Sequence, residues 1–153
     1  MSSSSALAKV SRHTLRQLKF ILPGGLTTWY FDSHHELWRI LEGEHDVGGW
    51  ARTFAAIILA SALLTISLFL YILTLPLITG EQPNYRHWRQ SGVLSRVIPV
   101  LTTSILTGWS LLSYTLGHWS SLGYVEGTIA STGLYALSFG LLGLLPAPQL
   151  HRR

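Results

Sequence analysis

The strongest constraint on this chain is an uncharged segment of 28 residues, 53–80, which follows Arg52. The hydrocarbon core of a bilayer is about 30 Å thick, and a helix of about 20 apolar residues crosses it. The segment is therefore long enough to span a membrane. It is too long and begins too far into the chain to be the hydrophobic part of a secretory signal. We interpret it as an uncleaved membrane span.

Two further apolar segments follow, at about residues 94–116 and 122–145, and the first span covers about residues 51–78. Only 12% of the residues are charged, against about 25% in ordinary soluble domains. A chain of 153 residues has room for one domain. We predict an all-α membrane protein with three transmembrane helices, preceded by one or two interfacial amphipathic helices.

This prediction divides the chain into three parts. Residues 1–50 form an amphipathic region at the membrane surface, residues 51–145 the three-helix transmembrane domain, and residues 146–153 a short basic tail. The chain has no cysteine, which excludes disulfides, cysteine-ligated zinc and thiol nucleophiles. The formal net charge of +4 indicates affinity for anionic lipids rather than for nucleic acid, because the basic residues flank the membrane segments.

The N-terminal segment up to residue 31 contains no acidic residue and is typical of a basic amphipathic helix. Such a helix lies uncleaved on an anionic membrane or acts as a mitochondrial transit peptide. We favour the surface helix, and a disordered basic tail is the third alternative. The basic face consists of Lys9, Arg12, Arg16 and Lys19, and the apolar face of Leu7, Val10, Leu15 and Leu18.

Two local signals divide the N-terminal region into two helices. The sequence Pro23-Gly24-Gly25 predicts the end of the first helix. Ser33 and Glu36 have the spacing of a capping box, which predicts a second, short helix ending near Leu41.

Between the first two spans, Arg86 and Arg89 flank Trp88 in a loop over residues 81–92. Cationic and aromatic residues together are expected at the headgroup level, so both arginines are lipid-surface candidates.

The second and third spans carry hydroxyl groups and small residues at helical spacing. Such faces allow helices to approach closely and to form hydrogen bonds with each other. Alternatively, each hydroxyl bonds the carbonyl four residues earlier in its own helix. The hydroxyl stripes are Thr103, Thr107, Ser110 and Tyr114 in one span and Thr128, Ser131, Tyr135 and Ser138 in the other, which also has Ala130, Gly133, Ala136, Gly140 and Gly143. Thr107, Gly133 and Gly140 are our helix-packing candidates.

Glu126 is the one acidic residue within a predicted span. An acidic side chain in a membrane is by default a functional candidate. Because Glu126 lies only about one turn inside the third span, we favour a structural role in helix packing, with Arg52 or His118 as its ion-pair partner.

Several histidines lie near carboxylates, at Asp32, His34, His35 and Glu36 and again at Glu42 and His45. A Glu-x-x-His spacing places two metal ligands on one helix face, but Gly43 interrupts it here. The pattern would need a second copy from another helix, and Asp32 and His35 offer one only loosely. We interpret the cluster as the solvated face of an interfacial helix and expect no metal and no cofactor. Phosphate-binding loops, nucleophile elbows and zinc-protease motifs are absent from the sequence.

Two short segments resemble those of a known family. They are His87-Trp88-Arg89-Gln90 and the segment from Leu145 through Pro146-Ala147-Pro148 to His151. The family that they resemble is the ORMDL family of sphingolipid regulators. The resemblance implies a regulator of a lipid-synthesis enzyme. That family has four membrane segments where this sequence predicts three, and the first half of the chain does not match. We therefore transfer no residue roles.

Three functions are compatible with these features. We favour a non-catalytic accessory, assembly or regulatory subunit of a larger membrane complex. The alternatives are a small membrane enzyme acting on a lipid or other apolar substrate, with Glu126 and a histidine as acid and base, and a regulator of lipid synthesis. The partners are then other membrane subunits and anionic lipids. The endoplasmic reticulum or another endomembrane is favoured, and the mitochondrial inner membrane is the alternative.

Overall fold

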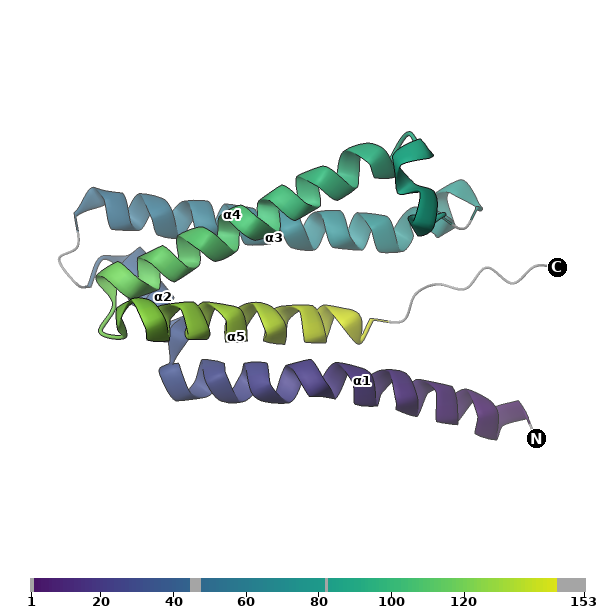
Figure 1. The fold of residues 1–153 in the computed structure, drawn as a ribbon, viewed down its shortest axis with the longest axis horizontal. Helices are drawn as coiled ribbons and strands as arrows, with labels where there is room; N and C mark the ends of the chain where they lie inside the picture. Colours follow the sequence, from purple (N-terminus) through teal and green to yellow (C-terminus); the bar gives the residue numbers. More distant parts are fainter. Residues whose placement is uncertain (1, 45–47, 82, 146–153) are drawn as a thin grey trace. The chain divides into compact units, whose positions relative to one another are not determined.

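The computed structural model describes residues 2–44, 48–81 and 83–145. These residues form helices joined by short connections, and no strand occurs among them. The helices are α1 (Ser2–Phe31), α2 (Ser33–Glu42), α3 (Gly49–Thr79), the short 3-10 helix η1 (Tyr85–Gln90), α4 (Leu94–Trp119) and α5 (Gly123–Gly143) (Figure 1). The chain divides into two compact units, one with residues up to 55 and from 112 to 146, the other with residues 56–111.

Helices α3 and α4 agree closely with the first two predicted spans. Within the described part of the chain, these two helices are long and apolar enough to cross a membrane. The third predicted span forms α5, whose 21 residues are long enough to cross a membrane. Its many small and polar residues lower its mean hydropathy, so α5 is not among the candidate spans. The all-helical class is thus confirmed with two candidate spans, and a third crossing stays a prediction.

The predicted helix end at Pro23-Gly24-Gly25 is wrong. All three residues lie inside α1, which continues to Phe31. A proline in a helix interior removes a backbone hydrogen bond and costs about 3 kcal/mol. Here Gly24 lies where α1 packs closely against another helix. The Thr27 hydroxyl also donates to the carbonyl of Pro23 over 2.7 Å within α1. Tertiary packing therefore overrides the local signal.

The boundary between α1 and α2 is Asp32, in the left-handed conformation with φ 50°. Asp tolerates this conformation better than most residues. The predicted capping box is wrong in its detail: Ser33 is the first residue of α2 rather than its cap, and its hydroxyl is buried with no hydrogen-bond partner in the described structure. Gly43, at φ 80°, ends α2, and its N–H donates to the carbonyl of Arg39 over 3.0 Å.

The first unit is built on an antiparallel pair of helices, α1 and α5, which lie side by side (Figure 1). Thr27 faces Gly133, Ile21 faces Gly140 and Gln17 faces Gly143. The residue number falls along α1 as it rises along α5, which defines the antiparallel direction. A small core of this unit consists of Ile40, Ala51 and Ala55, with Leu37, Leu41 and Trp119 packed against it.

The second unit contains most of α3 and α4, linked by a buried hydroxyl contact. The Thr65 and Ser104 hydroxyls are hydrogen-bonded to each other, and Ser104 also donates to the carbonyl of Ser61 over 3.1 Å. Such bonds between helices are favourable where water is excluded.

In the predicted loop between α3 and α4, the Asn84 side chain accepts a hydrogen bond from the backbone N–H of Arg86 over 3.2 Å and so begins η1.

Candidate functional site

The glycine face of α5 lies directly against α1. A Cβ atom added to Gly133 would lie 2.6 Å from Cβ of Thr27, and one added to Gly140 would lie 2.6 Å from Cγ1 of Ile21. Both distances are shorter than van der Waals contact, so a side chain at either position would force the helices apart. Gly133 and Gly140 thus lie in a contact with α1 of the same chain.

Gly24 makes the tightest contact on the α1 side, and it was not among our packing candidates. An added Cβ would lie 2.6 Å from the backbone nitrogen of Leu137 and 2.7 Å from the carbonyl oxygen of Gly133. At the end of the pair, the His13 imidazole bonds the carbonyl of Gly143 over 2.7 Å. Carbonyls in the last turn of a helix lack partners within it, so this bond joins α1 to the C-terminal end of α5.

Thr107 lies at a groove between α3 and α4. The groove has a volume of about 350 Å³ and an open side. The groove includes Ser104, whose hydroxyl is hydrogen-bonded to Thr65 and to the Ser61 carbonyl of α3. Its lining residues are Ser61, Leu64, Pro99, Val100, Thr103, Ser104 and Thr107. Small and hydroxyl-bearing side chains of this kind are typical of surfaces where membrane helices meet.

Four of the eight hydroxyls of the two predicted stripes bond a carbonyl of their own helix. Thr103 donates to the Pro99 carbonyl over 2.8 Å, and Ser138 donates to the Leu134 carbonyl over 2.9 Å. Thr128 and Ser131 also donate to the carbonyls four residues earlier. The bond between helices is made by Thr65 and Ser104 instead, a pair that lies outside the stripes that we identified.

Glu126 lies in the first turn of α5 and is exposed. Among the described residues, no ion pair joins its carboxylate to Arg52 or His118, the expected partners. His118 instead bonds the Tyr124 hydroxyl over 3.0 Å and stacks on Tyr114 with ring centroids 5.5 Å apart. The carboxylate therefore has no histidine partner for acid–base chemistry in this part of the structure.

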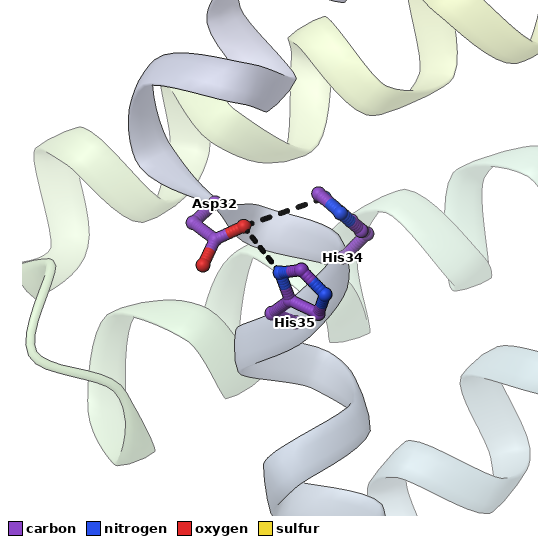
Figure 2. Close-up of side chains that lie close together, drawn as sticks. All are labelled: Asp32, His34 and His35. Carbon is purple, nitrogen blue, oxygen red and sulfur yellow. Dashed lines mark hydrogen bonds and ion pairs between the residues drawn. The ribbon is translucent and has the colours of Figure 1, made fainter.

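The junction of α1 and α2 brings together Asp32, His34 and His35. Nδ1 of His35 lies 2.6 Å from Oδ1 of Asp32, and Nδ1 of His34 lies 3.8 Å from the same oxygen. Figure 2 shows the carboxylate turned toward both imidazole rings. All three side chains are about half exposed to solvent. The sequence pattern placed these residues near each other, but it did not predict that their donor atoms converge.

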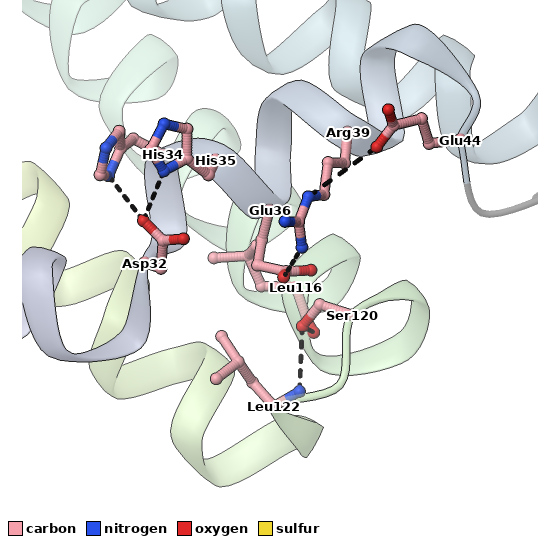
Figure 3. A network of polar contacts seen from close by, with 9 residues as sticks. All are labelled: Asp32, His34, His35, Glu36, Arg39, Glu44, Leu116, Ser120 and Leu122. Carbon is pink, nitrogen blue, oxygen red and sulfur yellow. Dashed lines mark hydrogen bonds and ion pairs between the residues drawn. The ribbon is translucent and has the colours of Figure 1, made fainter.

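A second polar group occupies another side of α2 (Figure 3). Arg39 donates to the buried carboxylate of Glu36 over 3.1 Å and lies 3.8 Å from Glu44. Glu36 is thus an ion-pair partner of Arg39 rather than a member of the histidine cluster.

The connection from α4 to α5 is held by Ser120, whose hydroxyl bonds the Leu116 carbonyl and accepts the N–H of Leu122 over 3.2 Å.

The lipid-surface candidates are exposed wherever the structure describes their side chains. Arg12, Arg16 and Lys19 lie on α1, and Arg86 and Arg89 lie in η1. The Arg89 guanidinium lies 5.4 Å from the centre of the Trp88 ring. The side chain of Lys9, the residue His45 and the basic tail at 146–153 lie outside the described structure.

A family model described as TMEM128 protein matches residues 9–140. The match includes α2, α3, η1 and α4 and most of α1 and α5. No curated protein and no solved structure matches the chain. Together with the two long apolar helices, the family match shows a membrane protein. The chain belongs to the TMEM128 protein family.

Proposed function

We propose that this protein is a non-catalytic accessory, assembly or regulatory subunit of a larger membrane complex, and that the groove between α3 and α4 receives a helix of a partner membrane protein. The observation that carries the proposal is the groove itself, with Thr107 on its lining. It lies on the two helices that are long and apolar enough to cross a membrane.

The chemistry of the groove favours a helix over lipid chains as its occupant. Its lining presents the side chains of Ser61 and Thr107 beside Leu64 and Val100, together with Thr103, whose hydroxyl already donates within its own helix. Lipid chains offer no hydrogen-bond partner to hydroxyl groups, whereas a second helix offers side chains and backbone atoms at short range. Hydrogen bonds between membrane helices contribute about 0.6 kcal/mol each on average, so shape complementarity supplies most of the affinity.

The enzyme alternative receives less support from the geometry. Acid–base catalysis needs the two groups within hydrogen-bond reach of a common substrate. In the described part of the chain, Glu126 is exposed and not paired with a histidine. The lipid-synthesis regulator is a special case of the accessory role, in which the partner is a lipid-synthesis enzyme.

The pairing of α1 with α5 supports a revision of the three-crossing arrangement. The contacts of Gln17, Ile21 and Thr27 with α5 place the uncharged residues 20–31 of α1 beside the middle of α5. If α5 enters the membrane, α1 enters with it. The number of crossings is then even, with α3 and α4 forming one hairpin and α1 and α5 a second pair.

The same contacts support an uncleaved N-terminus. His13 and Gln17 both contact Gly143, so removal of a transit peptide through residue 20 would uncover the end of α5. An uncleaved basic helix favours the endoplasmic reticulum or another endomembrane over the mitochondrial inner membrane.

Site-specific crosslinking tests the groove directly, because the chain has no cysteine of its own. A photoreactive thiol reagent would be attached to Thr107→Cys, or to Leu106→Cys as the control on the neighbouring, exposed face of α4. We expect Thr107→Cys to crosslink one protein that also co-purifies in mild detergent, and Leu106→Cys to crosslink lipid.

A blocking variant completes the test. Thr107→Phe should fill the groove and abolish recovery of the crosslinked protein, whereas Leu106→Phe should preserve recovery. Equal crosslinking from both cysteines, or recovery unaffected by Thr107→Phe, would contradict the proposal.

A further inference from the structure

The junction between α1 and α2 presents three metal-ligand side chains within five consecutive residues. The carboxylate of Asp32 and the imidazoles of His34 and His35 each offer one ligand atom, and these atoms all lie within 4.8 Å of one another. They come from the residue that separates the two helices and from the first turn of α2. Figure 2 shows that the three side chains lie on the same side of this turn.

The distances are close to those of a metal site. Ligand bonds of about 2 Å in a tetrahedral site place the ligand atoms about 3.3 Å apart. His34 Nδ1 is 3.8 Å from Asp32 Oδ1, and His35 Nδ1 is 2.6 Å from it. All three ligand atoms lie within 4.8 Å of one another, so ion binding requires the side chains to adjust. The rings are half exposed or more, with centroids 4.2 Å apart, so an ion reaches them from solvent.

The backbone holds the carboxylate in place. The Glu36 N–H donates to the Asp32 carbonyl over 3.0 Å, and the Asp32 N–H donates to the Trp29 carbonyl over 3.4 Å. Asp32 is therefore tied to the last turn of α1 and to the first turn of α2. The nearby cation, Arg39, is paired with the carboxylates of Glu36 and Glu44 on another side of α2 (Figure 3).

We propose that Asp32, His34 and His35 bind a divalent transition-metal ion, with Zn²⁺ as the ion that fits best. Two imidazole nitrogens and one carboxylate oxygen suit zinc in tetrahedral geometry, with water as the fourth ligand. The bound ion joins the end of α1 to the start of α2. The proposed site departs from the sequence-based expectation of no metal, which considered the Glu42–His45 spacing and a loose match at Asp32 and His35 but not the convergence of Asp32, His34 and His35.

Metal binding to the full-length protein tests the site. The protein, purified in mild detergent and stripped with a chelator, would be titrated with Zn²⁺ by calorimetry and with Co²⁺ by visible absorption. We expect one ion per chain, a tetrahedral Co²⁺ spectrum and a higher unfolding temperature with Zn²⁺, because an ion that binds the folded state stabilises it. Binding should weaken in acid, where protons compete for the imidazole nitrogens.

Substitution of each of the three proposed ligands locates the ion. His34→Gln and His35→Gln should each lower the affinity for Zn²⁺ about tenfold or more, since loss even of a group behind a metal ligand costs about 10–100-fold. Asp32→Asn should act similarly while preserving the junction, because Asn also adopts the left-handed conformation. His87→Gln, an exposed histidine of η1, is the matched control and should bind as wild type.

The outcomes are distinguishable. Absence of saturable Zn²⁺ binding by the wild-type protein would overturn the proposal. It would also be overturned if His34→Gln and His35→Gln bound Zn²⁺ as tightly as wild type, or if His87→Gln lost as much affinity as they did, because the ion would then lie elsewhere.

Discussion

Two adjacent glycines of α1, Gly24 and Gly25, have very different surroundings. A Cβ at Gly24 would collide with backbone atoms of α5, which no side-chain rotation can move. A Cβ at Gly25 would meet the Leu137 side chain at 3.8 Å, an ordinary contact. The two residues are neighbours of the same type, and the packing of α5 gives them different surroundings.

We therefore expect opposite effects from Gly24→Ala and Gly25→Ala. Gly24→Ala should destabilise the protein by about 1–3 kcal/mol, the usual cost of overpacking. Gly25→Ala should be neutral or stabilise the protein by about 0.5–1 kcal/mol, because alanine restricts the unfolded chain and favours the helix. Thermal unfolding in mild detergent measures both. Equal stabilities of the two variants would show that α1 does not pack on α5 through Gly24.

Glu126 allows a second test at the scale of a single residue. Its carboxylate is exposed in the first turn of α5, where a negative charge interacts favourably with the helix dipole by about 0.3–1 kcal/mol. We expect Glu126→Gln to cost no more than this in stability and to leave abundance and partner recovery intact. If Glu126→Gln instead abolished cellular function while partner recovery was intact, the acid would have a chemical role.

At the scale of elements, the pair α1 and α5 depends on three small residues of α5 that face α1. Gly133, Gly140 and Gly143 each lie against a larger side chain of α1, respectively Thr27, Ile21 and Gln17. The larger side chains of one helix fill the space that the glycines of the other leave. Contacts between membrane helices depend on such close approach.

Gly133→Leu and Gly140→Leu should separate the pair, because a leucine side chain occupies the volume of Thr27 or Ile21. We expect each variant to lower the unfolding temperature in detergent and the cellular abundance. The controls Leu134→Ile and Leu141→Ile conserve volume and should cost less than about 1.5 kcal/mol. Wild-type stability of both glycine variants would contradict the packing shown here.

The basic half of α1 extends from the α5 contact toward the N-terminus (Figure 1). Replacing Lys9, Arg12, Arg16 and Lys19 by Gln should reduce retention of anionic lipid on the purified protein. Each basic residue near an anionic surface contributes about 1 kcal/mol, so the loss should be large and should be reproduced by high salt in the wild type. A mature protein that begins beyond residue 20 would instead favour the transit-peptide interpretation.

At the scale of the whole molecule, the proposed membrane arrangement depends on the packing of α1 along α5. Because the two helices pack side by side along much of their length, in the proposed arrangement both of them cross the membrane or both lie on its surface. In the arrangement proposed above, the α3–α4 hairpin adds two crossings. The total is even in either case, whereas the three-span arrangement expected from the sequence is odd.

We expect tags at the N- and C-termini to have the same accessibility in sealed membranes. Protease protection before and after permeabilisation measures this, with a tag inserted in the loop near Tyr85 as an internal reference for the α3–α4 hairpin. Opposite accessibility of the two terminal tags would restore the three-span arrangement and would require α1 to leave α5 in the membrane.

The sequence alone determined where the long apolar helices lie and that the chain is helical. The uncharged segment that follows Arg52 predicted α3, and the alternation of apolar and polar segments predicted α4, α5 and the all-helical class. Membrane insertion depends on the transfer free energy of consecutive side chains, so it can be inferred without knowledge of any partner helix.

The tertiary structure decided the features that depend on which helices meet. Pro23, Gly24 and Gly25 end a helix in isolation, yet α1 continues through them because Gly24 allows backbone contact with α5. Asp32, His34 and His35 converge because Asp32 adopts a left-handed conformation between two helices. Both outcomes depend on backbone geometry and on distances between side chains, which no local pattern specifies, and both become definite once α1, α2 and α5 are packed.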